Sequence, residues 1–181
     1  MKLSRNFYLK NTLVVCKELL GKVLVYNDMS GIISEVEAYR GTGDDACHAA
    51  RGMTPRNKPM FEAGGFSYIY FIYGMYHCMN ISTEKEGFPA AVLLRGIVPL
   101  EGKEKMIINR GGKTKAISNG PGKLCQALGL DKTSNNIDLV TSDFFYVEDR
   151  GIKPKTIHTS PRIGISTAQD LEWRFFAKEF L

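Results

Sequence analysis

Glu35 and Glu37 stand two residues apart in the segment I-I-S-E-V-E-A-Y, whose residue types and alternation are typical of a β-strand. Alternate side chains of a strand point to the same face, so Glu35, Glu37 and Tyr39 are expected on one face together with Ile33, and the two carboxylates about 7 Å apart. A carboxylate in such a place can act as a general base that activates a water molecule. The alternative is an ordinary solvated strand face, which is the commoner setting for glutamates in strands.

A second group of chemistry-bearing residues is the tyrosine-rich stretch S-Y-I-Y-F-I-Y-G-M-Y-H-C-M-N-I-S, which holds four of the chain's eight tyrosines. Its first six residues predict a strand with Tyr68 and Tyr70 on one face. Gly74 interrupts the run and indicates a hairpin with Tyr73 and Met75 near its tip. A tyrosine at a tip has little to pack on, so its side chain is suited to entering another molecule. The alternative is a hairpin folded against the core.

A long polar loop is expected over residues 41–66, and a connection of this length usually has a functional reason. The loop contains His48 next to Cys47, and the tyrosine stretch contains His77 next to Cys78. These residues lack the spacing of a metal site, so no metal is expected. No serine lies in a nucleophile elbow and no lysine in an apolar run, which argues against covalent catalysis.

The composition describes an ordinary globular chain with a basic surface. The 181 residues are 44% hydrophobic and carry a formal net charge of +5, with a sequence pI near 9.0. This charge is compatible with a polyanionic partner. Neither a run of about 18 apolar residues nor a signal peptide is apparent, so an intracellular protein without a membrane span is expected. The four cysteines are scattered, which indicates free thiols.

The remaining elements follow from residue periodicity, caps and turns. Arg95 interrupts an apolar strand and is expected to hold a carboxylate or face a polar cleft. Gly120, Gly122 and Lys123 provide free amides, a helix N-terminus and a cation that together suit an anion, although a plain capped helix is the alternative. The sequence predicts helices over 12–20, 99–109 and 121–128. It predicts strands over 22–26, 32–39 and 90–98, and further strands near 144–147 and 162–165. A turn is expected over 27–31 and a basic loop over 110–120.

Taken together, these features favour a protein that handles nucleic acid bases. Aromatic side chains beside a basic surface provide faces on which unpaired bases stack. A carboxylate that activates water next to such a platform indicates chemistry on a nucleotide taken out of the helix.

The same residues carry a resemblance to a known family. The chain resembles the alkyladenine (3-methyladenine) DNA glycosylases of the non-helix-hairpin-helix type, and the resemblance spans nearly the whole chain. The matching motifs are E-V-E-A-Y (35–39), A-C-H-A-A-R-G-M-T-P-R-N (46–57), Y-I-Y-F-I-Y-G-M-Y-H-C-M-N (68–80), V-L-L-R (92–95) with P-L-E-G (99–102), and G-P-G-K-L-C-Q-A-L (120–128).

The resemblance implies an α+β fold and a role for each motif. It implies a single domain over residues 1–181, with a curved, mostly antiparallel β-sheet core, flanking short helices and a protruding DNA-intercalating β-hairpin. Glu37 would be the general base, and Arg95 would hold a phosphate or the active-site water. The other implied roles are a base pocket of Tyr39, His48, Tyr70 and Asn80, a hairpin tip of Tyr73 and Met75 that enters the duplex, and phosphate binding by Gly120, Gly122 and Lys123.

The resemblance also implies the reaction and its partner. The enzyme would be a monofunctional glycosylase without a metal or cofactor, acting as a monomer on double-stranded DNA that contains alkylated or deaminated purines. Its substrates would be 3-methyladenine and 7-methylguanine, with hypoxanthine and ethenoadenine as further candidates. The location would be cytoplasmic or nucleoid-associated in a bacterium and nuclear otherwise. His77 stands where relatives commonly have an aromatic ring.

Two other classes of protein remain alternatives at this point. A non-catalytic nucleic-acid-binding module would use the tyrosine hairpin as a wedge and would have no need of Glu37. A deaminase-like nucleobase hydrolase would require zinc. Tyrosine rings attract cations through their quadrupoles, so a tyrosine-walled pocket favours the cationic N-alkylated purines.

Overall fold

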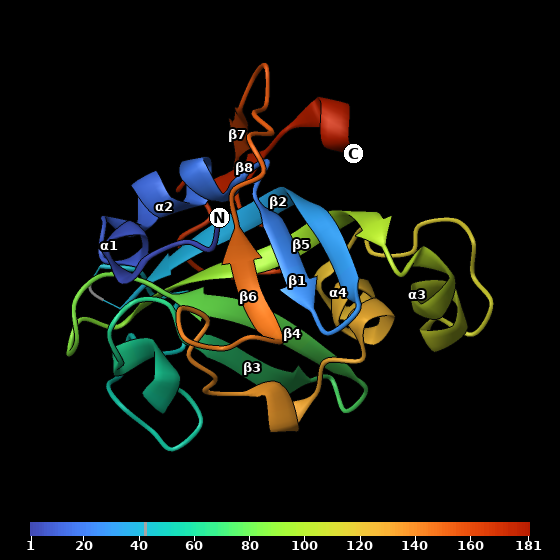
Figure 1. The fold of residues 1–181 in the computed structure, drawn as a ribbon. Helices are drawn as coiled ribbons and strands as arrows, with labels where there is room; N and C mark the ends of the chain where they lie inside the picture. Colours follow the sequence, from blue (N-terminus) through green and yellow to red (C-terminus); the bar gives the residue numbers. More distant parts are fainter. Residues whose placement is uncertain (42) are drawn as a thin grey trace.

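The computed structural model describes residues 1–41 and 43–181, and its centre is one antiparallel sheet that curls into a half-barrel (Figure 1). The strand order is β3-β4-β5-β2-β1-β6, and β8 pairs with both β2 and β7. The α+β architecture expected from the sequence is thereby confirmed. The eight strands are β1 Val23–Tyr26, β2 Met29–Arg40, β3 Ser67–Ile72, β4 Tyr76–Ser82, β5 Ala90–Glu101, β6 Phe145–Glu148, β7 His158–Ser160 and β8 Arg174–Phe176.

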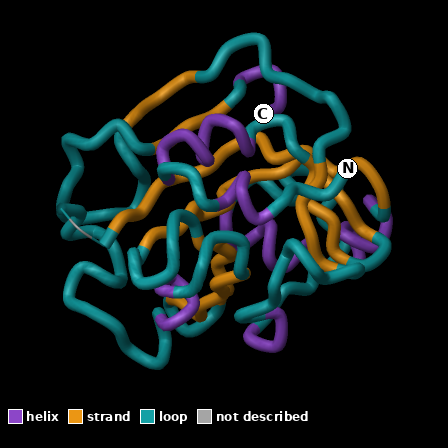
Figure 2. The backbone as a smooth tube through the Cα atoms, turned by 60° about the vertical axis from the view of Figure 1, so that its left-hand side comes forward, coloured by secondary structure: helices purple, strands orange, loops and turns teal. Residues whose placement is uncertain are grey.

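Short helices pack around this sheet, and long loops connect the elements (Figure 2). The side chain of Asn11 accepts a hydrogen bond from the backbone N–H of Leu13 and so caps α2. Pro121 begins α4, and Gly129 ends it in the left-handed conformation, as the sequence predicts. The helices are α1 Arg5–Tyr8, α2 Thr12–Leu19, α3 Lys103–Asn109 and α4 Pro121–Leu128, with 3-10 turns η1 Lys58–Phe61, η2 Lys132–Ser134 and η3 Lys178–Phe180.

Three predicted elements differ from the structure. The helix expected from Pro99 begins only at Lys103, because β5 continues through Pro99, which pairs with Gly31 of β2. This pairing also makes Gly31 part of a strand, so the turn before β2 is shorter than expected. No strand forms over residues 162–165, and the strands of this region are β7 and β8.

The expected face pattern of β2 is wrong at Ile33. Strict alternation places Ile33 on the face of Glu35 and Glu37, but its side chain lies in the main core together with Val36 and Ala38. Register shifts against β5 on both sides of Glu35 explain the difference. A bulge of this kind adds a residue to one strand and so turns the residues before it to the other face.

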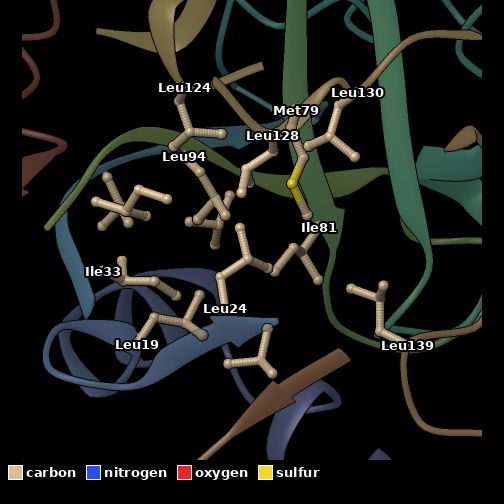
Figure 3. Packing of buried hydrophobic residues seen from close by; sticks show 14 of the residues in the cluster. Leu19, Leu24, Ile33, Met79, Ile81, Leu94, Leu124, Leu128, Leu130 and Leu139 are labelled. Carbon is tan, nitrogen blue, oxygen red and sulfur yellow. The ribbon is translucent and has the colours of Figure 1, made fainter. Parts of the chain in front are cut away.

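The main hydrophobic core fills the inside of the curled sheet. Leu24 of β1 and Ile81 of β4 belong to the same buried cluster although two strands separate β1 from β4 in the sheet order. Figure 3 shows these side chains together with residues of α2 and α4. The labelled members are Leu19, Leu24, Ile33, Met79, Ile81, Leu94, Leu124, Leu128, Leu130 and Leu139.

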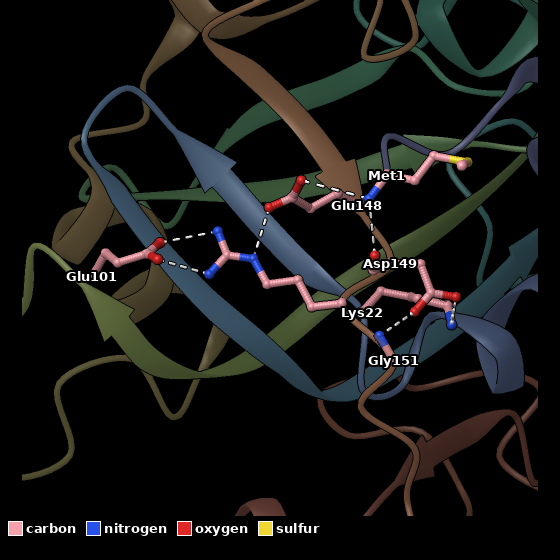
Figure 4. Close-up of polar contacts among 7 residues, drawn as sticks. Met1, Lys22, Glu101, Glu148, Asp149 and Gly151 are labelled. Atoms are coloured by element: carbon pink, nitrogen blue, oxygen red, sulfur yellow. Dashed lines mark hydrogen bonds and ion pairs between the residues drawn. The ribbon is translucent and has the colours of Figure 1, made fainter.

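A group of polar contacts ties the end of β6 to its neighbours (Figure 4). The guanidinium group of Arg150 forms ion pairs with Glu101 at the end of β5 and with Glu148 of β6, each at 2.7 Å. Lys22 pairs with Asp149 at 2.7 Å. These groups are partly exposed, so each pair is expected to stabilise the fold by about 1 kcal/mol or less.

No helix in the described part of the chain is both long enough and apolar enough to cross a membrane.

Candidate active site

Glu37 lies in the middle of β2, between β5 on one side and β8 on the other, and its side chain is fully buried. The Tyr39 hydroxyl donates a hydrogen bond of 2.9 Å to Oε2. The backbone N–H of Ile163 donates a hydrogen bond of 2.8 Å to Oε1, and the guanidinium of Arg95 lies 3.3 Å from the same oxygen. A buried carboxylate with three donors is held in one orientation.

The two glutamates have opposite electrostatic settings. Burial raises the pKa of Glu37 above the usual glutamate value, although Arg95, Ile163 and Tyr39 act against this shift. Burial acts the same way on Glu35, but hydrogen bonds from Arg174 and Arg95 outweigh it and hold the pKa of Glu35 below its usual value. Glu35 therefore accepts hydrogen bonds from two arginines and has a lowered pKa, whereas Glu37, with a single arginine at 3.3 Å, has a raised pKa of the kind common at catalytic sites.

A cavity of about 270 Å³ lies beside Glu37. Tyr39 connects the two, because its hydroxyl bonds Glu37 and its side chain lines the cavity. The four residues predicted to form a pocket, Tyr39, His48, Tyr70 and Asn80, all line this one cavity. The other lining residues are Asp45, Ala46, Met60, Tyr68, Ile72, Gly164, Ile165, Ser166 and Thr167.

His48 is fixed in the cavity wall by two tyrosines. Its Nδ1 lies 3.0 Å from the hydroxyl of Tyr68, and its ring centroid lies 4.6 Å from that of Tyr70 in an edge-to-face arrangement. Burial, and then the nearby charge of Arg56, lowers the pKa of His48, which favours the neutral imidazole. The hydroxyl of Tyr68 therefore orients His48.

Asn80 enters the cavity from β4, and only 4% of its surface is exposed. Its side-chain amide donates a hydrogen bond of 3.1 Å to the carbonyl of Tyr68, the residue opposite it on β3. The cross-strand pair thus fixes the position of Asn80 in the cavity wall.

The tip of the β3–β4 hairpin projects into solvent. Tyr73 is 77% exposed and Met75 is 61% exposed. Tyr73 and Gly74 both have positive φ angles, of 55° and 67°. A tyrosine rarely adopts this left-handed conformation, which points to a conformational constraint at the tip. Neither Tyr73 nor Met75 lines the cavity beside Glu37.

Gly120, Gly122 and Lys123 lie in a separate groove of about 420 Å³ at the start of α4, with no lining residue in common with the cavity beside Glu37. The ring of Tyr76 packs so closely that a Cβ at Gly122 would lie 3.1 Å from it. This contact joins the tyrosine hairpin to α4. The groove also contains Arg110, Lys113, Pro121 and Gln126.

Residues 162–167 contribute to the site although no sequence pattern predicts their role. Ile163 supplies the backbone donor to Glu37, and residues 164–167 line the cavity. Arg162 forms two hydrogen bonds of 2.7 Å with Asp44, and neither side chain is exposed. The guanidinium of Arg162 also lies 4.7 Å from the ring centroid of Tyr39. The only signals in the sequence are the charges of Asp44 and Arg162, 118 residues apart, and nothing in the sequence pairs them.

Within residues 1–41 and 43–181, no three His, Cys, Asp or Glu side chains are grouped so as to hold a metal ion.

An aromatic cavity beside a buried carboxylate is suited to holding a planar ring next to a general base. Comparison with known proteins identifies the family of the chain. The family model described as methylpurine-DNA glycosylase matches residues 6–180, and the chain belongs to that family. Membership implies DNA N-glycosylase activity, and hence a part in DNA base excision repair.

Related proteins match over most of their length. A relative from Sodalis glossinidius is 54% identical over 173 residues, which cover 96% of this chain and 95% of the relative. A relative from Wolbachia pipientis wMel is 52% identical, with 96% and 89% covered. A relative from Rickettsia felis is 43% identical, with 99% and 94% covered. The names of all three assign them to 3-methyladenine DNA glycosylase.

Proposed function

We propose that the protein is a monofunctional DNA glycosylase that flips alkylated or deaminated purines out of duplex DNA and hydrolyses their N-glycosidic bond. The observation that carries this proposal is the buried carboxylate of Glu37 beside an aromatic cavity, with its oxygens bonded by Tyr39 and Ile163. The substrates would be 3-methyladenine and 7-methylguanine, with hypoxanthine and ethenoadenine as further candidates.

Glu37 would act as the general base. A water molecule would attack the sugar C1′ and transfer a proton to Glu37, while the bond from C1′ to the purine nitrogen breaks and its electron pair leaves with the base. The transition state places positive charge on the sugar, which an ionised Glu37 stabilises. Arg95, 3.3 Å from Oε1, counteracts the rise in the pKa of Glu37 and so favours the ionised form.

The cavity would receive the flipped base. The rings of Tyr39, His48 and Tyr70 would stack on it, and each stacked base is worth roughly 1–3 kcal/mol in other proteins. Asn80, held by the carbonyl of Tyr68, would limit the purines that fit through contact with their exocyclic groups. The cationic groups of the groove at α4, with Lys123 beside the helix N-terminus, would hold the DNA backbone.

Tyr73 and Met75 would enter the duplex where the flipped base leaves a gap. Tyr73→Ala is expected to slow excision from duplex DNA about tenfold, because the flipped state would lose the side chain that keeps the duplex open. The measurement is the single-turnover excision rate on duplex and on single-stranded substrate. Ile108→Ala, which removes a similarly exposed side chain from α3, serves as the control. Equal rates for Tyr73→Ala and the parent protein on duplex would show that Tyr73 takes no part in base capture.

The direct test of the proposed function uses oligonucleotide duplexes that carry a 3-methyladenine-type base, hypoxanthine or ethenoadenine. Incubation with the protein should leave abasic sites, which alkali converts to strand breaks. Without alkali the strands should stay intact, because a monofunctional glycosylase has no amine nucleophile for strand cleavage. Strand breaks before alkali, or intact strands after it for every lesion, would refute the proposal.

A further inference from the structure

Two tyrosines of the cavity wall are covered by arginines that do not themselves line the cavity. The guanidinium carbon of Arg162 lies 4.7 Å from the ring centroid of Tyr39. The guanidinium carbon of Arg56 lies 5.1 Å from the ring centroid of Tyr70. Each cation therefore places a positive charge close to a ring of the cavity wall.

The two arginines differ in how much of their charge is compensated. Arg162 is fully buried and forms two hydrogen bonds with the carboxylate of Asp44. Arg56 is exposed and forms no ion pair with any residue that the structure describes. A hydrogen bond of 3.3 Å to the carbonyl of Phe71 holds the guanidinium of Arg56 against the hairpin. Arg56 thus places a positive charge next to the cavity wall, and no ion pair with a described residue compensates it.

The charge of Arg56 acts on residues of the cavity wall. After burial, it is the second cause that lowers the pKa of His48, whose ring contacts Tyr70. A base stacked on the ring of Tyr70 would lie against the side chain that the guanidinium of Arg56 covers, so it would experience the positive potential of Arg56.

We propose that Arg56, acting through Tyr70, is the residue that sets the preference of the pocket between cationic N-alkylated purines and neutral deaminated purines. The inference rests on the proposed function and deepens it. Arg56 does not touch the base in this arrangement, so its influence is electrostatic.

The direction of the effect of Arg56 follows from how the charge of the base changes during the reaction. When the bond to C1′ breaks, its electron pair passes to the base, so the charge of a cationic purine changes from +1 to 0. The charge of a neutral purine changes from 0 to −1. A nearby positive charge speeds both departures equally, but it repels only the cationic purine before the bond breaks. Arg56 therefore weakens the capture of cationic purines and leaves the capture of neutral purines unchanged.

The experiment measures single-turnover excision as a function of protein concentration, which yields a maximal rate and a half-saturation concentration for each lesion. Duplexes carry 7-methylguanine or hypoxanthine at one position. The variants are Arg56→Gln, which removes the charge, and Arg56→Lys, which retains it. Arg51→Gln, at an exposed arginine of the same loop, is the control for the loss of net charge.

For Arg56→Gln, the maximal rate is expected to fall about two- to tenfold for both lesions. The reason is that the departing base loses the stabilisation by one positive charge, which solvent and salt partly screen. Relative to Arg51→Gln, half-saturation should shift to lower protein concentration for 7-methylguanine and stay unchanged for hypoxanthine. Arg56→Lys should resemble the parent protein. Tighter capture of one lesion cannot result from a damaged fold.

An equal change in half-saturation for both lesions, or no change in either, would overturn the role of Arg56. Failure of the parent protein to release either base would instead refute the proposed function, so the two ideas fail separately.

Discussion

Glu37→Gln is expected to abolish base release while the variant still captures damaged DNA. The amide has nearly the same shape as the carboxylate but cannot accept a proton from water or stabilise positive charge on the sugar. General base catalysis contributes roughly 10²–10⁴-fold, and the loss of charge stabilisation adds to this effect. The measurement is single-turnover excision of 7-methylguanine together with binding of the same duplex.

Glu35→Gln provides the matched comparison, because sequence reasoning alone cannot say which of the two glutamates is the base. Glu35 is held by Arg95 and Arg174 at 2.8 and 2.7 Å, so its loss should lower the rate less than the loss of Glu37. If Glu37→Gln released the base at the parent rate, the proposed mechanism would be wrong. If the parent protein bound damaged DNA but released no base, a non-catalytic binding module would be the better description.

Asp44→Asn is expected to destabilise the whole protein by about 3–5 kcal/mol, because it leaves the buried guanidinium of Arg162 without its counter-ion. The guanidinium of Arg162 would keep a hydrogen bond of 2.9 Å to the carbonyl of Ala38 and its contacts with the rings of Tyr39 and Trp173. Its Nε has no hydrogen-bond partner, and these neutral groups do not replace a carboxylate. The measurement is the free energy of unfolding from urea denaturation, with the loss appearing as a lower midpoint.

The double variant Asp44→Asn with Arg162→Met tests whether the uncompensated charge of Arg162 causes the loss of stability. It should recover part of the lost stability, since Arg162→Met removes the buried charge that Asp44→Asn leaves without a counter-ion. Glu18→Gln is the control for an exposed pair, because it breaks the partly exposed contact with Lys10 and should cost about 1 kcal/mol or less. A loss of similar size for Asp44→Asn and Glu18→Gln would contradict the assigned role of Arg162.

The parts of the site that lie on regular elements were predictable from the sequence. Strand alternation in β3 places Tyr68 and Tyr70 together, and both rings are on the cavity wall. The hairpin was predictable because Gly74 stands between two β-rich runs, and α4 because proline and glycine mark its ends. Each of these patterns is local, so a few residues carry the whole signal.

The parts that depend on distant residues were not predictable. The donor to Glu37 is a backbone N–H, which every residue except proline possesses, so Ile163 carries no distinguishing mark. The bulge at Glu35 breaks the alternation on which the face assignment of Ile33 depended. Pro99 has the residue type of a helix start, and its place in β5 depends on pairing with Gly31, which lies far away in the sequence.

The bond from Ile163 to Glu37 joins residues 126 positions apart in the chain. A ribosome therefore completes β2, with its glutamate, long before it synthesises the segment that supplies the donor and lines the cavity. Contacts between such distant residues form late in folding, because a long loop has to close first. During translation the nascent chain thus carries the carboxylate of Glu37 without its backbone donor, and the cavity is completed only after residues 162–167 have emerged.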